Sequence, residues 1–422
     1  VGKALGKLLT EKKEHPKVVI GRDTRISCDM IEHALTAGLT STGVNVMTVG
    51  IIPTPAIAYL TKTIETDSGI MISASHNPYQ DNGIKIFGPD GFKLTDEQEL
   101  EIESLIDNSE QIKNASFEKI GKVYGGNELT QKYIQHIKQS ITGDLSDIKI
   151  ALDCANGATT GVAPFIFGDL EADIETIGCQ PNGVNINDNV GSTKIETISE
   201  FVKENNVDVG FAFDGDGDRV LAVDAKGNIV DGDKIMFILA KHLKEQGELK
   251  DNMVVSTVMS NIGFYKAIEE NGLQSVKTAV GDRYVVEEMR KNDYSLGGEQ
   301  SGHIVLMNYA TTGDGILTAV KLANIIKTSG KSLEELASEV NIYPQKLVNI
   351  KVVDKKTAME DAEILAECEK VEKELEGNGR ILLRASGTEK LIRVMVEASS
   401  DELTDKYCEQ VAKIVREKFE VK

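Results

Sequence analysis

The sequence predicts an α/β protein with three similar α/β domains on mixed sheets, followed by a smaller α+β domain at the C-terminus. Three observations carry this prediction. One pattern of strand, amphipathic stretch and two further strands occurs three times along the chain. The length of 422 residues suggests about three domains at ~150 residues each. The hydrophobic content of 41% is ordinary for a globular chain and too high for intrinsic disorder.

The three repeats are recognised by their strands and by the loops that follow them. First strands are predicted at 18–20, 148–152 and 253–255. Second strands end in a β-branched residue and glycine at 49–50, 177–178 and 280–281, a spacing of about 30 residues that fits a βαβ unit. Third strands at 67–72, 208–213 and 293–297 run into S-A-S-H-N-P (73–78), D-G-D-G-D-R (214–219) and G-E-Q-S-G-H (298–303). Because ligands bind beyond the carboxyl ends of such strands, we expect the three loops to face a shared cleft.

The C-terminal segment has a different pattern. It predicts a strand at 347–353, a helix at 357–375, strands at 380–383 and 391–397, and a closing helix at 401–419. We therefore expect domains at 1–128, 129–230, 231–345 and 346–422. At the other end, Val1 leads directly into V-G-K-A-L-G-K-L-L without an initiator Met, in helical apolar spacing, and we expect a further segment to precede it.

Net charge indicates which partners are unfavourable, and cysteine content indicates the redox compartment. The net charge of −20 and pI near 4.9 argue against nucleic acid or an anionic membrane surface as a partner. The five cysteines (28, 154, 179, 368 and 408) contain no C-x-x-C pair, as expected in a reducing compartment. No apolar run approaches the ~18 residues of a membrane span. We therefore predict a cytoplasmic protein.

The acidic loop is the clearest candidate metal site. Asp214, Asp216 and Asp218 alternate with glycines, so three hard oxygen ligands can surround one Mg²⁺ or Ca²⁺. An EF-hand would need Gly and Glu where this loop has Arg219 and Ala225. Three like charges at the end of a buried strand would repel without a cation. The coordination positions left open suit a metal that also holds a phosphate.

The first loop offers a serine at a tip. Turn-forming residues after Ser75 display its hydroxyl group, which could act as a nucleophile or a phosphate acceptor, with His76 beside it. Ser-His pairs are more often ordinary loop residues. Lys85 could bring positive charge to a phosphorylated serine, or it could be a solvated surface lysine.

The third loop and two helix starts offer further polar groups. Glu299, Ser301 and His303 suit sugar hydroxyls, with a polar hairpin as an equal alternative. Arg22 and Arg25 could face a phosphate or pair with Asp23 and Asp29. Arg283 could bind substrate or supply an ordinary charge at a helix start.

The fourth-domain loop combines residue types that bind phosphate. Two guanidinium groups, two hydroxyl groups and a glycine-exposed backbone are predicted to form a phosphate cradle. These residues are Arg384, Ser386, Gly387, Thr388 and Arg393. The alternative is that Arg384 pairs with Glu389.

Taken together, S-A-S-H-N-P, D-G-D-G-D-R, G-E-Q-S-G-H and R-A-S-G-T-E (384–389) resemble the motifs of the α-D-phosphohexomutase family, in the family's order and over nearly the whole chain. The resemblance implies four domains around a central cleft. It also implies that Ser75 is phosphorylated and that one Mg²⁺ is held by Asp214, Asp216, Asp218 and that phosphate. The family reaction passes the phosphoryl group to a hexose monophosphate. The resulting sugar bisphosphate, an activator and intermediate, reorients and returns its other phosphate to the serine.

The resemblance also implies roles for the other candidates. Arg219 would neutralise charge on the transferred group. Glu299 and Ser301 would hold sugar hydroxyls, with Arg22 and Arg283 as further substrate contacts, and the fourth-domain loop would grip the phosphate that is not reacting. His76, Lys85 and His303 are unranked candidates for proton movement or charge stabilisation.

The sequence departs from the family pattern in two places that the resemblance connects with the active site. Ala385 and Lys390 stand where the family usually has prolines, which predicts a more mobile loop. The family's N-terminal F-G-T-x-G-x-R-G segment, with an arginine that helps the active site, is absent from the sequence. We therefore expect either a longer natural chain or impaired activity.

Within the family, Gln300 and T-T-G-D-G (311–315) favour the branch that converts glucosamine 6-phosphate into glucosamine 1-phosphate, a precursor of cell-wall amino sugars. The expected partner is a hexosamine phosphate, and the resemblance leaves a homodimer open. The alternatives are the phosphomannomutase and phosphoglucomutase branches, a catalytically silent sugar-phosphate-binding protein, and a metal-dependent phosphatase. A phosphatase with paired aspartates would use a carboxylate as nucleophile and would not need Ser75.

Overall fold

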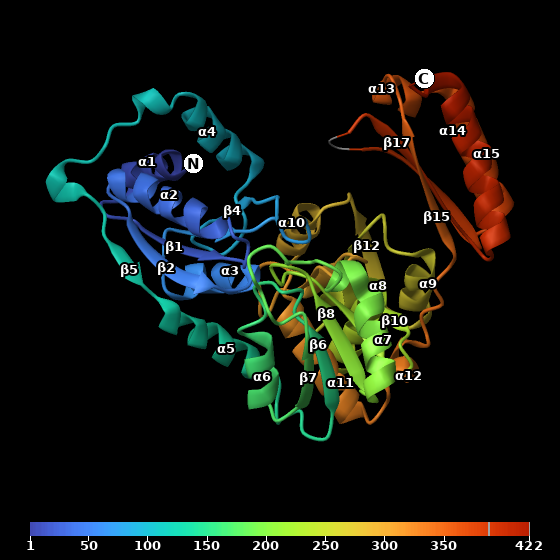
Figure 1. The fold of residues 1–422 in the computed structure, drawn as a ribbon. Helices are drawn as coiled ribbons and strands as arrows, with labels where there is room; N and C mark the ends of the chain where they lie inside the picture. Colours follow the sequence, from blue (N-terminus) through green and yellow to red (C-terminus); the bar gives the residue numbers. More distant parts are fainter. Residues whose placement is uncertain (387–388, 422) are drawn as a thin grey trace. The chain divides into compact units, whose positions relative to one another are not determined.

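The computed structural model describes residues 1–386 and 389–421, and the chain forms two compact units. The larger unit consists of Val1–Met259 and Gly272–Glu339, and the smaller of Ser260–Asn271 and Val340–Lys422. Each unit has its own sheets and hydrophobic core, and Figure 1 gives the path of the chain through both.

The first sheet forms from short apolar strands separated by amphipathic helices. Val18, Val19 and Ile20 of its central strand are fully buried. Its strands are β1 (Lys17–Arg22), β2 (Asn45–Ile51), β3 (Ser68–Ile72), β4 (Ile84–Phe87) and β5 (Val123–Gly125), and the helices of this region are α1 (Gly2–Lys12), α2 (Cys28–Ser41), α3 (Thr54–Thr63) and α4 (Asp96–Asp107). The strand order is β4-β3-β1-β2-β5. The helix α5 (Thr130–Lys138) follows this region along the chain.

The second sheet has the order β10-β9-β8-β6-β7. Its strands are β6 (Lys149–Asp153), β7 (Asp173–Ile177), β8 (Val209–Phe213), β9 (Val220–Asp224) and β10 (Ile229–Val230), with helices α6 (Ala163–Asp169) and α7 (Ile195–Asn205). Every residue of β8 is buried. This strand ends at the acidic loop.

The third sheet has the order β12-β11-β13-β14. Its strands are β11 (Met253–Thr257), β12 (Gln274–Thr278), β13 (Leu296–Gly298) and β14 (Ile304–Leu306), and the helices of this region are α8 (Gly232–Gln246), α10 (Asp282–Asn292), α11 (Gly315–Ser329) and α12 (Leu333–Ala337). The helix α9 (Ile262–Glu270) belongs to the smaller unit.

All three sheets share one arrangement of their first four strands. In each sheet, the first strand lies between the second and third and is parallel to both. The fourth strand pairs antiparallel with the third. The predicted repeat and the mixed character of the sheets are therefore confirmed.

The repeat extends to the turn after each first strand. Asp23 and Asp153 each accept a hydrogen bond at Oδ1 from the backbone N–H two residues on, both at 2.9 Å. Thr257 accepts one at Oγ1 from Met259 at 3.2 Å. A side-chain oxygen that closes such a turn ends the strand sharply and fixes the start of the next segment.

The smaller unit contains a three-stranded antiparallel sheet of order β15-β17-β16. Its elements are β15 (Gln345–Lys351), β16 (Gly379–Ala385), β17 (Leu391–Ala398), α13 (Lys355–Met359), α14 (Ala362–Leu375) and α15 (Asp401–Phe419). Tyr407, Cys408, Val411 and Val415 of α15 are buried in its core. The predicted α+β domain is confirmed.

Several predicted element bounds differ from the structure, and the three largest differences are the following. The third strand of the third repeat begins only at Leu296, because Asp293 ends α10 in a left-handed conformation (φ 59°). The helix predicted at 357–375 is two helices, because the Asp361 carboxylate accepts the N–H groups of Glu363 and Ile364 and caps a new start. In addition, β12 ends at Thr278, three residues before the predicted end at Gly281.

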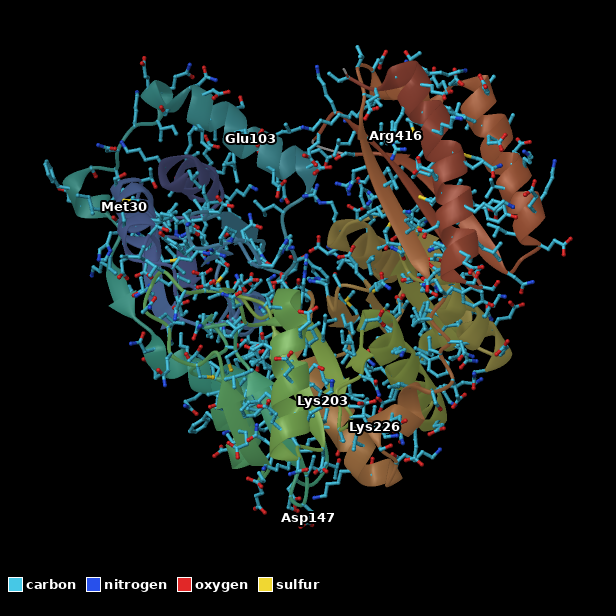
Figure 2. The ribbon with its side chains drawn as sticks, turned by 45° about the vertical axis from the view of Figure 1, so that its right-hand side comes forward. Met30, Glu103, Asp147, Lys203, Lys226 and Arg416 are labelled. Carbon is cyan, nitrogen blue, oxygen red and sulfur yellow. The ribbon has the colours of Figure 1, made fainter. Side chains whose placement is uncertain are left out.

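Helix surfaces follow the expected amphipathic pattern (Figure 2). On α4, Ile102 is buried and the adjacent Glu103 is exposed, and on α7 the same holds for Val202 and Lys203. Among the described residues, no helix combines the length and the apolar character needed to cross a membrane.

Candidate active site

The acidic loop extends from the buried strand β8. Asp214, Asp216 and Asp218 have exposed fractions of 0%, 0% and 4%, and each offers a carboxylate oxygen within 4.8 Å of the others. A Cβ at Gly215 would lie 2.5 Å from the carbonyl oxygen of Ser75. Glycine is therefore required where the acidic loop approaches the serine loop.

The carboxyl groups of Asp214 and Asp218 have pKa values shifted in opposite directions. Burial raises the pKa of Asp214 well above its usual value, and the charges of Asp218 and Asp216 add to this shift. Burial also opposes ionisation of Asp218, but Lys85 and His303 hold the pKa of its carboxyl group well below the usual range. The Lys85 ammonium lies 2.5 Å from Asp216 Oδ2 and 2.9 Å from Asp218 Oδ2. The positively charged Lys85 side chain therefore contacts two of the three carboxylates.

The triad fits a hard divalent cation. Asp216 Oδ1 and Asp218 Oδ1 are buried without a hydrogen-bond partner, and a carboxylate oxygen can only accept hydrogen bonds or bind a cation. Oxygen-only ligands suit Mg²⁺ or Ca²⁺ better than Zn²⁺. The described residues therefore supply a cluster that can hold the predicted metal.

Ser75 lies directly at this triad. Its hydroxyl donates a hydrogen bond to Asp214 Oδ2 at 2.6 Å, and its Oγ lies 3.5 Å from His76 Nδ1. Burial is the main cause of the lowered pKa of His76, and the Arg219 charge adds to it. The expected proximity of the serine to the acidic loop is confirmed, although the two residues are 139 positions apart.

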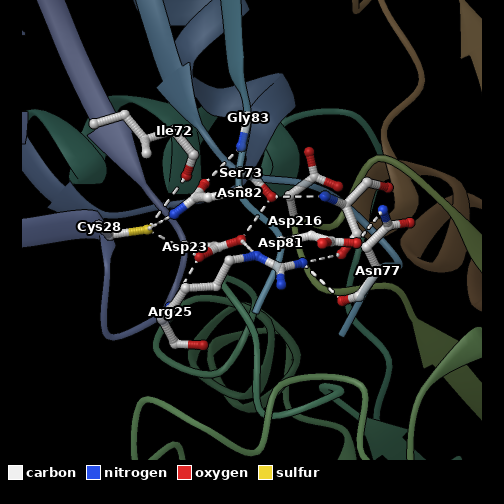
Figure 3. Close-up of polar contacts among 12 residues, drawn as sticks. Asp23, Arg25, Cys28, Ile72, Ser73, Asn77, Asp81, Asn82, Gly83 and Asp216 are labelled. Atoms are coloured by element: carbon white, nitrogen blue, oxygen red, sulfur yellow. Dashed lines mark hydrogen bonds and ion pairs between the residues drawn. The ribbon is translucent and has the colours of Figure 1, made fainter. Parts of the chain in front are cut away.

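Arg25 and Asp23 belong to a polar network (Figure 3) that also holds the backbone around Ser75. The Arg25 guanidinium donates to the carbonyl oxygens of Ser75 and Asn77, both at 2.9 Å, and to that of Pro78 at 2.5 Å. The same guanidinium is 2.8 Å from Asp23 Oδ2. Asn187, from the second domain, donates to the carbonyl oxygens of Ser75 and Asn77 at 2.9 and 3.0 Å.

The third loop also meets the acidic loop. The backbone N–H of Val220 donates to the Gly302 carbonyl oxygen at 3.1 Å, and His303 Nδ1 lies 3.7 Å from Asp218 Oδ1. His303 is only 3% exposed, and its Nε2 accepts a hydrogen bond from the N–H of Gly313 at 3.1 Å. The imidazole of His303 is therefore buried next to Asp218 and is not exposed at the protein surface.

The other residues of the third loop have separate positions. Glu299 Oε1 accepts the N–H of Gly281 at 3.2 Å, and Ser301 is exposed. Gln300 donates through Nε2 to Asp231 Oδ2 at 3.1 Å. All three loops meet within the larger unit, as expected, but their side chains are not equally close to the triad.

Arg22 and Arg283 are paired with carboxylates. Arg22 contacts Asp29 and Glu32 of α2 at 2.6 and 3.1 Å. Arg283 contacts Asp96 and Glu99 of α4, the latter at 3.1 Å. Both pairings considered for the two arginines form, Arg22 with Asp29 and Arg25 with Asp23. Substrate binding by Arg22 and Arg283 stays a prediction.

The fourth domain places two guanidinium groups side by side. Arg384 on β16 and Arg393 on β17 are direct partners in the antiparallel register, and the Nε of each is buried without a hydrogen-bond partner. Burial and the neighbouring charge of Arg393 lower the pKa of Arg384. Like charges opposite each other are destabilising, so this pair favours an anion as its ligand.

The remaining residues of this loop are only partly described. Ser386 is buried, and its Oγ accepts the N–H of Glu389 at 3.4 Å. Glu389 lies 3.7 Å from Arg393, so the carboxylate considered as a partner for Arg384 approaches the other arginine. Gly387 and Thr388 lie outside the described residues.

Three contacts were not predicted from the sequence. For Arg25 the sequence suggested a phosphate contact or a pairing with a nearby carboxylate, but not its hydrogen bonds to the serine loop. Thr54 donates through Oγ1 to Asp216 Oδ2. Asn187, in the second domain, donates to carbonyl oxygens of the serine loop in the first. No short motif marks Thr54 or Asn187, because their positions depend on how the domains pack.

The fold and site define a class of protein: an α/β protein in which a serine lies beside an acidic triad that can hold a metal ion. Four segments match the four domains of one family. Residues 1–113, 131–227 and 231–343 match phosphoglucomutase/phosphomannomutase alpha/beta/alpha domains I, II and III, and residues 347–414 match the C-terminal domain. The chain belongs to the phosphoglucomutase/phosphomannomutase family and is a phosphohexomutase-type isomerase.

Similar proteins agree with this membership. Phosphoglucosamine mutase of Anoxybacillus flavithermus is 59% identical over 420 residues, which cover 99% of this chain and 94% of that protein. The phosphoglucosamine mutase of Geobacillus thermodenitrificans is 58% identical over 422 residues, covering 100% and 94%. A family protein from Burkholderia thailandensis has the same fold (TM-score 0.83, 21% identity, covering 99% and 92%).

Proposed function

We propose that this enzyme interconverts glucosamine 6-phosphate and glucosamine 1-phosphate through a phosphoserine at Ser75 and a bisphosphorylated sugar. The observation that carries the proposal is the 2.6 Å hydrogen bond from Ser75 Oγ to Asp214, beside carboxylate oxygens that fit a cation. The glucosamine substrate is supported by the names of relatives that match 94% of their own length at 58–59% identity.

The chemistry follows from the groups around Ser75. The bond between phosphorus and Ser75 Oγ breaks while a bond forms to the free hydroxyl oxygen of the sugar, and the hydroxyl proton ends on Oγ. Asp214, Asp216 and Asp218 would hold Mg²⁺, which when bound neutralises charge on the phosphoryl oxygens. Arg219, whose backbone N–H donates to Asp214 at 3.1 Å, would add positive charge at the same place.

Proton movement has three candidates, and their positions differ. His76 has a ring nitrogen 3.5 Å from Ser75 Oγ. Lys85 is engaged by Asp216 and Asp218, which raise the pKa of its ammonium despite burial. His303 lies behind Asp218. We propose His76 for proton transfer, Lys85 for charge stabilisation and His303 for holding Asp218.

Sugar and phosphate contacts complete the proposal. Glu299 and Ser301 would hold sugar hydroxyls, with Arg22 and Arg283 as further contacts, and Arg384, Ser386 and Arg393 would hold the phosphate that is not reacting. The domain roles follow: phosphoserine (1–128), metal (129–230), sugar (231–345) and phosphate (346–422). The central cleft, the homodimer and the cytoplasmic location stay predictions.

A competition assay tests the substrate. We expect glucosamine 6-phosphate to exceed glucose 6-phosphate and mannose 6-phosphate in kcat/KM by about 10- to 100-fold, because one charge-assisted contact to the 2-ammonium group contributes ~1.5–3 kcal/mol. Weak activity on glucose 6-phosphate is expected. A preference for either hexose phosphate would assign the chain to another branch and leave the phosphoserine mechanism standing.

An Arg384→Ala variant tests the phosphate contact. The change removes one of two guanidinium groups whose Nε atoms are buried without a partner, and we expect KM to rise about 10- to 100-fold while Ser75 stays phosphorylated. Arg416→Ala is a matched control on α15, since Arg416 pairs with Glu409 on the same helix. An unchanged KM in Arg384→Ala would leave the loop with a packing role only.

A further inference from the structure

We propose that Arg25 and Asn187 are positioning residues that hold the Ser75 backbone so that its Oγ faces the acidic triad. This inference rests on the proposed function, since it assigns the geometry of the same serine. Neither residue was identified as a site residue from the sequence. The two come from different domains of the larger unit and converge on the same two carbonyl oxygens, those of Ser75 and Asn77.

Ser75 needs support because its backbone is strained. Its φ is 51°, in the left-handed region that a residue with a Cβ adopts at a cost of roughly 1–2 kcal/mol. Ser73 Oγ accepts the Ser75 N–H at 2.9 Å and donates to Asp23 Oδ2 at 2.6 Å. The N–H side of Ser75 is thereby fixed to the end of the first sheet.

Arg25 fixes the carbonyl side. Its side chain is fully buried, and three backbone carbonyl oxygens of the serine loop, those of Ser75, Asn77 and Pro78, accept its N–H groups. Asp23 balances its charge at 2.8 Å. Because a guanidinium donates in a fixed planar fork, one side chain sets the relative positions of these three peptide groups.

Asn187 links the same loop to the second domain. Its Nδ2 reaches the carbonyl oxygens of Ser75 and Asn77, while its own N–H donates to the Ala155 carbonyl oxygen at 2.8 Å. Asp153, at the end of β6, in turn accepts the N–H of Ala155. The contact thus connects the serine loop to the sheet that carries the acidic loop.

The consequence concerns turnover more than substrate binding. Ser75 Oγ must meet an incoming sugar hydroxyl and the triad together, and misplacement by about 1 Å can lower a rate about 100-fold. Neither Arg25 nor Asn187 is proposed to touch the sugar. Loss of either should therefore lower kcat and slow phosphorylation of Ser75 while KM changes little.

The test compares Asn187→Asp with Asn189→Asp in the full chain. Asp has the shape of Asn and also tolerates a positive φ, but it places an acceptor against two carbonyl oxygens. Asn189 lies in the same segment, has a φ of 56° and contacts only Asp188 through its side chain among the described contacts. Arg25→Lys, which keeps the charge and loses the fork, is the second variant.

Three quantities are measured: kcat, KM, and the half-time of Ser75 phosphorylation by glucose 1,6-bisphosphate, followed by intact mass. We expect Asn187→Asp to lower kcat about 10- to 100-fold, to lengthen the half-time and to keep KM within about twofold, with Asn189→Asp unchanged. Thermal midpoints show that each variant is folded. If Arg25→Lys does not fold, Asn187→Asp alone decides.

The outcomes separate this proposal from the function it rests on. A wild-type chain that takes no phosphate on Ser75 and has no mutase activity would overturn the proposed function. An active wild type together with an Asn187→Asp variant of normal kcat and normal half-time would overturn only the positioning role. A rise in KM at normal kcat would also contradict it, because it would place Asn187 in substrate binding.

Discussion

A Ser75→Ala variant is expected to lose nearly all mutase activity, with kcat lowered by about 10⁴-fold or more. The hydroxyl is the proposed phosphoryl carrier, and its hydrogen bond to Asp214 at 2.6 Å places it at the proposed metal ligands. Ala and Ser both carry a Cβ, so the strain of the positive φ is the same in both. The variant should therefore fold with a similar thermal midpoint.

Two measurements check this expectation. Turnover is measured with glucosamine 6-phosphate and a catalytic amount of a hexose 1,6-bisphosphate, and intact mass reports whether one phosphate is gained. Ser116→Ala, at an exposed position of the same domain, is the control and should keep both activity and the mass shift. Turnover of Ser75→Ala within a few-fold of the wild type would exclude the phosphoserine mechanism.

The fold was largely predictable because it repeats. Each repeat contains strands short and apolar enough to be recognised, and the same order occurs three times, so the mixed sheets follow from one pattern. What the pattern could not show was where local hydrogen bonds end an element. The Asp361 cap that divides the predicted helix at 357–375 is such a case, since many aspartates lie within helices without capping one.

The candidate site was predicted where a motif lies on one loop. Asp214, Asp216 and Asp218 are adjacent in sequence and meet for that reason, and Ser75 was found by its display at a turn. Sequence did not show which of two nearby arginines faces the serine loop. Arg22, in β1, reaches Asp29 and Glu32, whereas Arg25 lies beyond the Asp23 turn and reaches the loop carbonyls.

Contacts between domains could not be predicted from the sequence. Asn187 is 112 residues from Ser75, in a segment without periodicity, and only the packing of two sheets brings them together. The burial of His303 likewise depends on the 311–315 segment folding over it, where the Gly313 N–H reaches Nε2. Nothing in the sequence around His303 indicates that the 311–315 segment buries its side chain.

Removal of the proposed metal, or of one of its ligands, should lower turnover far more than substrate binding. We expect Asp216→Asn to lower kcat about 10²- to 10³-fold with KM changed by only a few-fold, since charge on the phosphoryl group is greatest in the transition state. Asp216 has one oxygen bound by Thr54 and Lys85 and a second, buried oxygen without a partner. An amide in this place would point a nitrogen at a cation or at Lys85, and either contact is unfavourable.

Asp173→Asn, an exposed aspartate of the same domain, controls for the loss of one negative charge. Excess chelator should reproduce the kcat loss in the wild type and added Mg²⁺ should restore activity, whereas full activity in chelator would give the acidic loop a structural role.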